Sequence, residues 1–293
     1  MAGSLEKLVQ FLDSEKSVIY IVLKRVQGSS PRDVGTEMFV SKRAFHGTIG
    51  GGQLEYLVIE RAQAMLRDGT LNTEMDIPLG PEIGQCCGGR VEISLARMRD
   101  SDIKCAINRA YKQNNSMPHV YVMGSGHVGR ALAAQLQHLP VRCILVDTRP
   151  EEIALCDANV EKRISAIPEI DVMSAPAGSA FIILTHDHSL DFLLTSSALE
   201  RNDACYVGMI GSVSKRAKFT NWTQNNTNPV SLDHLKCPIG MSTSNDKRPS
   251  IIASFVVAEV VNELTHGAKK SISEEENTVL QQYSQHDRKA ILV

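Results

Sequence analysis

The chain has 293 residues, of which 43% are hydrophobic and 22% are charged, and its formal net charge is −2. The length favours two packed domains of ordinary globular composition. No stretch approaches the run of about 18 apolar residues that spans a bilayer, so we expect a soluble protein with no membrane partner. Lys and Arg are scattered along the chain, which argues against nucleic acid as a partner. Seven cysteines without a CxxC pair or a signal peptide predict reduced thiols, a cytoplasmic location and no structural zinc.

The first half of the chain reads as a mixed α/β domain. Apolar residues at helical spacing predict a helix over 1–17, and the β-branched run 17–26 predicts a buried strand that ends at the loop 27–32. A short strand over 37–41 and a helix opened by the glycines of 47–52 follow. Alternating polarity over 91–98 predicts a half-buried strand. We therefore expect one domain over 1–98, followed by a linker helix over 99–117.

The second half changes to strand, helix and strand over 119–123, 127–138 and 141–146, which is the pattern of a βαβ unit. Buried strands over 181–185 and 205–209, each followed by a helical pattern, extend it to a parallel sheet. An apolar helix over 249–264 and a polar tail over 267–293 end the chain. The predicted fold class is thus α/β, with a C-terminal Rossmann-type parallel sheet over 118–266 and a smaller N-terminal α/β domain.

The motif GSGHVG follows the first of these strands and opens the next helix. Gly124, Gly126 and Gly129 would let the backbone approach a pyrophosphate at the helix amino terminus, and Asp147, about 20 residues later, could accept hydrogen bonds from ribose hydroxyls. The alternative is that the glycines serve only tight helix packing, because Rossmann domains also occur as scaffolds. The ligand need not be NAD, since any phosphate suits this position.

The motif THDHSLD begins where the strand over 181–185 ends, which is where ligands lie in doubly wound sheets. His186 and Asp187 are candidates for facing a ligand. His186 and His188 could also bind a metal, but their spacing is not specific for one. Alternatively, Asp187 or Ser189 only caps the following helix.

The motif GMIGSVSKR repeats the design of a strand, glycines, a serine and basic residues in the first turns of a helix. Four of its residues are candidates for binding a phosphate: Gly208, Gly211, Ser212 and Lys215. The alternative is a turn followed by solvated basic side chains.

The segment 79–91, LGPEIGQCCGGRV, places two adjacent cysteines between glycines in a stretch too irregular for helix or strand. Adjacent thiols do not easily share one tetrahedral metal. The glycines could expose a thiolate, and backbone N–H groups or Arg90 could lower the pKa of Cys86 or Cys87. Free cysteines are otherwise often inert core residues.

Seven motifs occur in order, and together they closely resemble the XdhC/CoxI family of xanthine dehydrogenase accessory proteins. They are GSSPRDVGTEMFV, GTIGGGQLE, LGPEIGQCCGG, GSGHVGRAL, DTRPE, THDHSLD and GMIGSVSKR. The resemblance runs from about Val18 to Leu264, and the combination of GTIGGGQLE with GQCCGG is highly specific.

The resemblance implies a carrier of molybdenum cofactor (molybdopterin), in its phosphate or dinucleotide form, that acts in purine catabolism. Such a protein shields the cofactor while a cysteine desulfurase exchanges an oxo ligand for sulfur. It then delivers the cofactor to the molybdenum-binding subunit of xanthine dehydrogenase. A homodimer is expected by the same resemblance. This reading makes the chain a maturation factor rather than an enzyme, with no catalytic residue, and it leaves open a nucleotide at the Rossmann site.

Carried over to this chain, the resemblance makes Cys87 the first candidate to hold the cofactor near molybdenum, with Cys86 as its neighbour. Gln85 could donate hydrogen bonds to an oxo or dithiolene group. Another wall of the same cleft would be formed by Gly50, Gly51, Gly52, Gln53 and Glu55. Glu55 could equally serve only as an acidic residue in the first helical turn, where it stabilises the helix dipole.

One position departs from the family pattern, in which a glutamate commonly stands two residues after the proline that opens the last helix. Here Pro249 is followed by Ser250 and Ile251. If that glutamate contacts a ligand in relatives, the function is altered here, whereas a mere helix cap would change little.

Two other functions fit parts of the sequence. An NAD(P)-dependent oxidoreductase would use GSGHVG and Asp147, with His186 or His188 as acid or base. A redox sensor would form a strained disulfide between Cys86 and Cys87.

Overall fold

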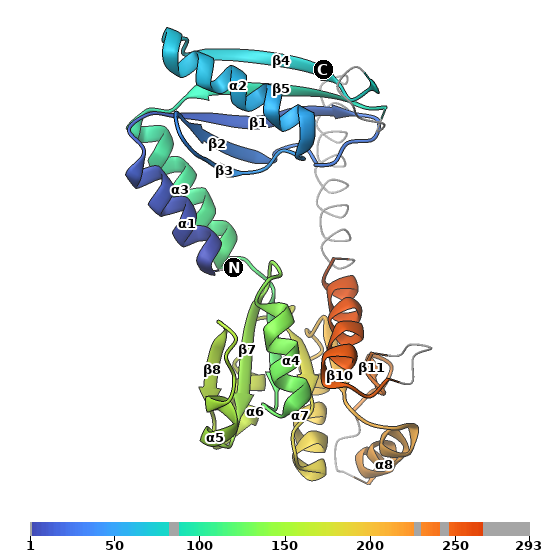
Figure 1. Cartoon of the computed structure of the whole chain (residues 1–293). Helices are drawn as coiled ribbons and strands as arrows, with labels where there is room; N and C mark the ends of the chain where they lie inside the picture. Colours follow the sequence, from blue (N-terminus) through green and yellow to red (C-terminus); the bar gives the residue numbers. More distant parts are fainter. Residues whose placement is uncertain (1, 82–87, 226–229, 241–245, 266–293) are drawn as a thin grey trace, which may run out of the picture. The chain divides into compact units, whose positions relative to one another are not determined.

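The computed structural model describes residues 2–81, 88–225, 230–240 and 246–265 (Figure 1). Contacts between Cα atoms divide the chain into two compact units, which cover residues 2–116 and 117–293. Each unit contains one β-sheet with its own helices and hydrophobic core. Among the residues described, no helix combines the length and the apolar character that crossing a membrane requires.

The first unit is built on an antiparallel sheet with the strand order β3-β2-β1-β5-β4. Its elements are α1 (Ala2–Ser14), β1 (Val18–Gln27), β2 (Glu37–Ser41), β3 (Phe45–Gly47), α2 (Gly52–Asp68), β4 (Asn72–Pro78), β5 (Arg90–Arg97) and α3 (Asp100–Asn115). The two edge strands, β3 and β4, were not predicted. β4 carries acidic residues and buries only Ile77, so its sequence lacks the apolar signal of a strand.

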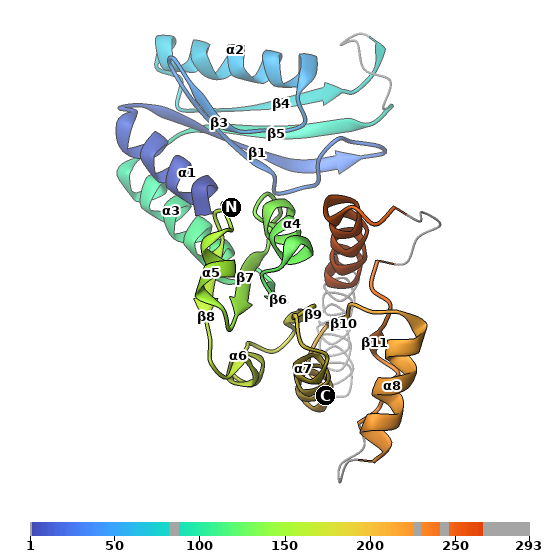
Figure 2. The same ribbon diagram turned by 60° about the horizontal axis from the view of Figure 1, so that its bottom comes forward.

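The two faces of this sheet are covered by different helices, as Figure 2 shows. Alternate residues of β1, including Ile19 and Ile21, point to the face that α2 covers with Leu54 and Val58. On the other face Phe39 packs against α1 and α3. The segment expected as a linker helix therefore forms α3, which shares a small core with α1.

The second unit is built on a parallel sheet with the strand order β11-β10-β9-β6-β7-β8. Its elements are β6 (His119–Met123), α4 (His127–Leu136), β7 (Arg142–Asp147), α5 (Pro150–Ala154), β8 (Glu161–Ile164), α6 (Pro168–Met173), β9 (Ala180–Ile183), α7 (His188–Glu200), β10 (Tyr206–Met209), α8 (Val213–Gln224), β11 (Leu235–Lys236) and a helix over 249–265. The short elements α5, β8, α6 and β11 were not predicted, because so few residues carry no clear period.

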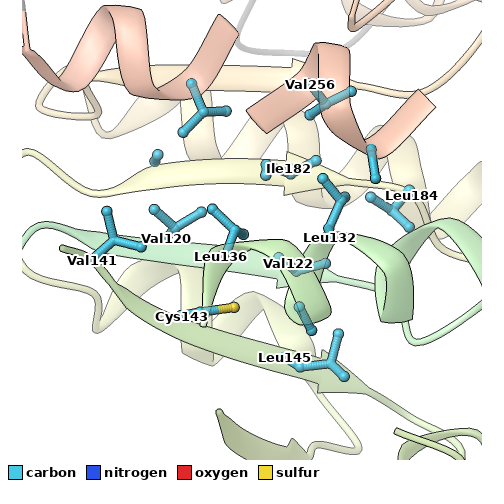
Figure 3. Packing of buried hydrophobic residues seen from close by; sticks show 14 of the residues in the cluster. Val120, Val122, Leu132, Leu136, Val141, Cys143, Leu145, Ile182, Leu184 and Val256 are labelled. Atoms are coloured by element: carbon cyan, nitrogen blue, oxygen red, sulfur yellow. The ribbon is translucent and has the colours of Figure 1, made fainter. Parts of the chain in front are cut away.

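Counted from β6, the strand order is that of the Rossmann fold. α4 and the helix over 249–265 cover one face, where Leu132 and Leu136 pack with Val120, Val122 and Val256 (Figure 3). α6, α7 and α8 cover the other face. The α/β fold class with a C-terminal Rossmann-type sheet is therefore confirmed. The topological switch point lies between β6 and β9, where ligands bind in this fold class.

Two glycines of GSGHVG are required by close packing at this switch point. A Cβ on Gly129 would overlap the carbonyl oxygen of Gly124, and one on Gly124 would overlap the carbonyl oxygen of Leu184 after β9. In contrast, a Cβ on Gly126 would meet no atom within 4 Å from any described residue outside its chain neighbours and the turn of α4 itself. Gly124 and Gly129 thus hold α4 against the sheet, as glycines of this fingerprint do.

We expect Gly129→Ala to lower the free energy of unfolding by about 1–3 kcal/mol, because the backbone must move to admit the methyl group. Gly126→Ala is the matched control and should cost less than about 1 kcal/mol, since its methyl group meets open space and only the helix cap is altered. Urea denaturation of both variants measures the difference, and equal losses would contradict the packing argument.

Candidate functional site

Three loops meet at one end of the sheet in the first unit, and we call them together the three-loop site. They are residues 28–32 after β1, residues 48–51 before α2, and the ends of the cysteine loop at Leu79 and at residues 88–89. Ser29 forms a β-bridge with Gly88. A Cβ on Gly89 would overlap the carbonyl oxygen of Ser29, and a Cβ on Gly50 would overlap the side chain of Pro31. The loops therefore approach so closely that only glycine fits at 50 and 89.

The base of the cysteine loop is closed by two backbone hydrogen bonds. The N–H of Leu79 donates to the carbonyl oxygen of Gly89 at 2.7 Å, and the N–H of Gly88 donates to that of Leu79 at 2.9 Å. The Leu79 side chain is fully buried, which anchors this base in the core. Gln85, Cys86 and Cys87 lie outside the described residues, so the hypothesis about their roles stays a prediction.

The loop before α2 contains three successive glycines with positive φ angles of 132°, 76° and 64°, at Gly50, Gly51 and Gly52. Side chains are strained in this region, which explains the unbroken run of glycines. Glu55 fixes the loop from the first turn of α2. Its Oε2 atom accepts hydrogen bonds from Thr48 Oγ1 at 2.7 Å and from the N–H groups of Ile49 at 3.3 Å and Gly51 at 3.0 Å.

Replacing Glu55 by alanine removes all three of these hydrogen bonds. We expect the free energy of unfolding to fall by about 2 kcal/mol, because hydrogen bonds to a charged group are worth more than neutral ones. Glu60→Ala is the matched control, since Glu60 is exposed on the same helix. If urea denaturation gave equal losses for both variants, Glu55 would have no special role in the loop.

The Rossmann crevice brings together several residues predicted from the sequence. The space at the ends of β6, β7 and β9 is lined by Gly124, Asp147 and His186, together with Thr185 and Leu190. The cavity there has a volume of about 10 Å³, which is room for about one water molecule. A larger ligand must therefore lie outside this space or move the side chains that close it.

Asp147 is bound within the protein on both carboxylate oxygens. Oδ1 accepts from the Arg149 N–H and Nε, each at 3.0 Å, and Oδ2 accepts from the Ser125 N–H at 2.6 Å and Arg149 Nη2 at 3.0 Å. Burial alone would raise the pKa of Asp147, but the hydrogen bonds from Arg149 and Ser125 outweigh it and leave the pKa below its ordinary value. Asp147 is therefore charged at neutral pH.

A second ion pair ties the glycine motif to α5. Arg130 Nη1 donates to Glu152 Oε2 and to the carbonyl oxygen of Ser125, both at 2.6 Å. Ser125 Oγ donates to the Glu152 carbonyl oxygen at 2.9 Å. The motifs GSGHVG and DTRPE are thus joined through Ser125.

A buried ion pair joins the other two motifs of the second unit. Lys215 Nζ donates to Asp191 Oδ2 and, at 2.9 Å, to the carbonyl oxygen of Ile210. Asp191 Oδ1 accepts from the N–H and the hydroxyl of Thr185, each at 2.8 Å. Asp191 is 1% exposed and Lys215 is 9% exposed. The Lys215 ammonium group, which the sequence suggested as a ligand for phosphate, is thus already bound by the carboxylate of Asp191.

The remaining candidates in these motifs have local structural contacts. Asp187 caps α7, where its Oδ1 accepts from the Ser189 N–H at 2.7 Å, and Ser212 caps α8 through the Lys215 N–H at 3.3 Å. Gly208 lies inside β10 and Gly211 packs against Lys215. The side chains of His186 and His188 are exposed. Within the described part of the chain, no three His, Cys, Asp or Glu side chains form a group that could hold a metal ion.

Sequence reasoning did not identify Arg149, Glu152 or Asp191 as residues that shape the crevice. Asp191 pairs with Lys215 of another loop and Glu152 pairs with Arg130 of α4, so spacing along the chain gave no signal for these two. Arg149 lies two residues from its partner Asp147, so the motif DTRPE held a local signal for this pair. Ile251, at the position that is commonly acidic in the family, lies half-buried in the first turn of the helix over 249–265.

Asp191→Asn should lower the free energy of unfolding by about 3–5 kcal/mol, because it leaves the Lys215 ammonium buried without its counter-charge. The double variant Asp191→Asn with Lys215→Met should recover at least half of that loss, since no unpaired charge remains. Urea denaturation of the wild type, of Asp191→Asn, of Lys215→Met and of the double variant completes the cycle. Additive losses would contradict a coupled pair.

Comparison with known proteins agrees with this geometry. The sequence model of the XdhC Rossmann domain matches residues 120–260, and that of the XdhC and CoxI family matches residues 11–74. No curated protein gives a significant match. A crystal structure described as a xanthine dehydrogenase from Bacillus halodurans has a TM-score of 0.74 and 16% sequence identity, with 90% of this chain and 96% of that chain covered. At this identity the likeness shows a shared fold.

The fold and the loops define a two-unit protein in which a glycine-rich antiparallel α/β unit precedes a Rossmann unit. The two family matches cover most of the chain and fall one in each unit. The chain belongs to the XdhC/CoxI family.

Proposed function

We propose that this protein binds molybdenum cofactor as cargo, protects it while an oxo ligand is exchanged for sulfur, and delivers it to xanthine dehydrogenase. The observation that carries the proposal is the three-loop site. Its glycines bring the loop 48–51 and both ends of the cysteine loop together around residues 28–32. The fixed ends of the cysteine loop support the proposal, because a thiol that holds a metal centre needs a firmly positioned backbone at its base.

The residues of the three-loop site fit a cofactor whose metal binds thiolate and carries polar ligands. Thiolate is a preferred ligand for soft and borderline metals, and we assign the contact with molybdenum to Cys87, with Cys86 and Gln85 beside it. Apart from its chain neighbours, no described residue has an atom within 4 Å of the position of a Cβ on Gly51, so the described part of the site leaves this backbone open to a ligand. Glu55 then acts as a positioning residue, because its carboxylate holds the Thr48 hydroxyl and the loop N–H groups in place.

The partners in this proposal follow from membership of the family. Its members are named for xanthine dehydrogenase, and the structural relative from Bacillus halodurans is described as one. We assign the delivery step to the molybdenum-binding subunit of that enzyme, and the sulfur to a cysteine desulfurase. A homodimer in the cytoplasm, acting in purine catabolism, completes the proposal.

An oxidoreductase that uses the Rossmann crevice is the weaker alternative. Such an enzyme would bind the ribose hydroxyls of NAD(P) at Asp147. Both oxygens of that carboxylate are bound by Arg149 and Ser125 instead. His186 and His188 are exposed, whereas an acid or base catalyst is typically held in a cleft by an oriented partner.

The test is an anaerobic titration with released molybdenum cofactor, in which the cofactor retained after desalting is quantified as a fluorescent pterin derivative. We expect the wild type to retain cofactor and Cys87→Ala to lose at least about tenfold in affinity, because one metal–thiolate contact is removed. Cys105→Ala is the matched control, since Cys105 is an exposed thiol on α3. No retention by the wild type would refute the carrier function, and equal loss in both variants would refute the role of Cys87.

A further inference from the structure

Dinucleotides bind to Rossmann folds in two halves. The pyrophosphate lies at the amino terminus of the first helix, and a carboxylate at the end of the second strand accepts hydrogen bonds from the adenosine ribose. In this chain Gly126 stands at the first position as the residue before α4, and Asp147 stands at the second as the last residue of β7. The two positions differ in how open they are.

The pyrophosphate position is open, because among the described residues none beyond the chain neighbours and the turn of α4 itself has an atom within 4 Å of the position of a Cβ on Gly126. The ribose position is filled by protein. A carboxylate offers about four acceptor positions. In Asp147 they are taken by the Ser125 N–H and by the backbone N–H, Nε and Nη2 of Arg149, at 2.6 to 3.0 Å. The Asp147 side chain is 3% exposed, so its carboxylate offers ribose hydroxyls almost no accessible surface.

Arg149 is held in this place by more than one carboxylate. Its Nη1 atom lies 4.0 Å from Glu152 Oε1, and Glu152 is fixed in turn by its ion pair with Arg130 at 2.6 Å. The side chains of Arg130, Arg149 and Glu152 are 19%, 28% and 27% exposed. The planar guanidinium meets Asp147 through two parallel hydrogen bonds, which is the strongest geometry available to this pair.

We propose that Arg149 closes the ribose half of the Rossmann crevice and so excludes dinucleotides that carry a free ribose diol. Arg149 is thus the residue that makes this crevice differ from an ordinary NAD-binding site. The inference rests only on contacts within the second unit, and it stands or falls independently of the cofactor-carrier function.

The experiment is a titration of the full chain with NADH, followed by energy transfer from Trp222, the chain's one tryptophan, to the nicotinamide, and by equilibrium dialysis. We expect no saturation of the wild type up to millimolar NADH. Arg149→Ala frees two acceptor positions on Asp147, and two hydrogen bonds of about 1 kcal/mol each correspond to at least about tenfold tighter binding. Arg149→Met, which keeps the apolar stem, should show the same gain, so that a folding defect in one variant does not decide the result.

Two controls separate this mechanism from a general loosening of the unit. Arg142→Ala removes an arginine from β7, the strand that ends at Asp147, where Arg142 pairs with Glu161. This variant should leave NADH unbound. Adding Asp147→Ala to Arg149→Ala should abolish the gain, because the ribose hydroxyls then lack their acceptor.

Four results would overturn the inference. Two concern the wild type: micromolar binding of NADH, or micromolar binding of NADPH with Arg149 on its 2′-phosphate. The third is failure of both Arg149 variants to gain affinity. The fourth is an equal gain in Arg142→Ala or in the double variant.

Discussion

Close approach between chain segments, with no room for a side chain on the glycine where they meet, is the constraint on which both units depend. In the first unit Gly89 lies against the carbonyl oxygen of Ser29 and Gly50 lies against Pro31, so three loops from distant parts of the chain share one end of the sheet. In the second unit Gly129 lies against Gly124, which lies against the end of β9. Any larger residue at these positions would separate the segments and displace every polar group they carry.

Within these closely packed segments, carboxylates bind many of the hydrogen-bond donors and so determine which groups remain available to a ligand. Glu55 binds the hydroxyl and N–H groups of the loop before α2, Asp147 binds Arg149 and Ser125, and Asp191 binds Lys215 and Thr185. Each of these acids joins two segments within its unit. The residues that look most like ligands for phosphate or ribose in the Rossmann unit are thus committed to internal pairs, because burying an unpaired charge would cost far more than pairing it.

The difference between the two units fits the proposal that the cargo binds to the first one. The three-loop site combines open backbone with a cysteine loop whose base is fixed by hydrogen bonds to Leu79, whereas the crevice of the second unit is closed by side chains. A Rossmann unit can serve as a scaffold, since function resides in sites placed on a fold and not in the fold itself.

The sequence by itself determined the parallel sheet of the second unit, the family and the positions of the glycine motifs, because hydrophobic period and glycine spacing are local properties of a chain. It missed β4 and β8, whose polar sequences form strands only because β5 and β7 offer a free edge for pairing. Only the tertiary structure decided that Lys215 faces Asp191 instead of solvent, and that Arg149 occupies the carboxylate of Asp147. The first pair depends on how the ends of β9 and β10 meet in space, which spacing along the chain does not encode. The second joins residues only two positions apart, so the structure decided the direction of the Arg149 side chain and not which residues are neighbours.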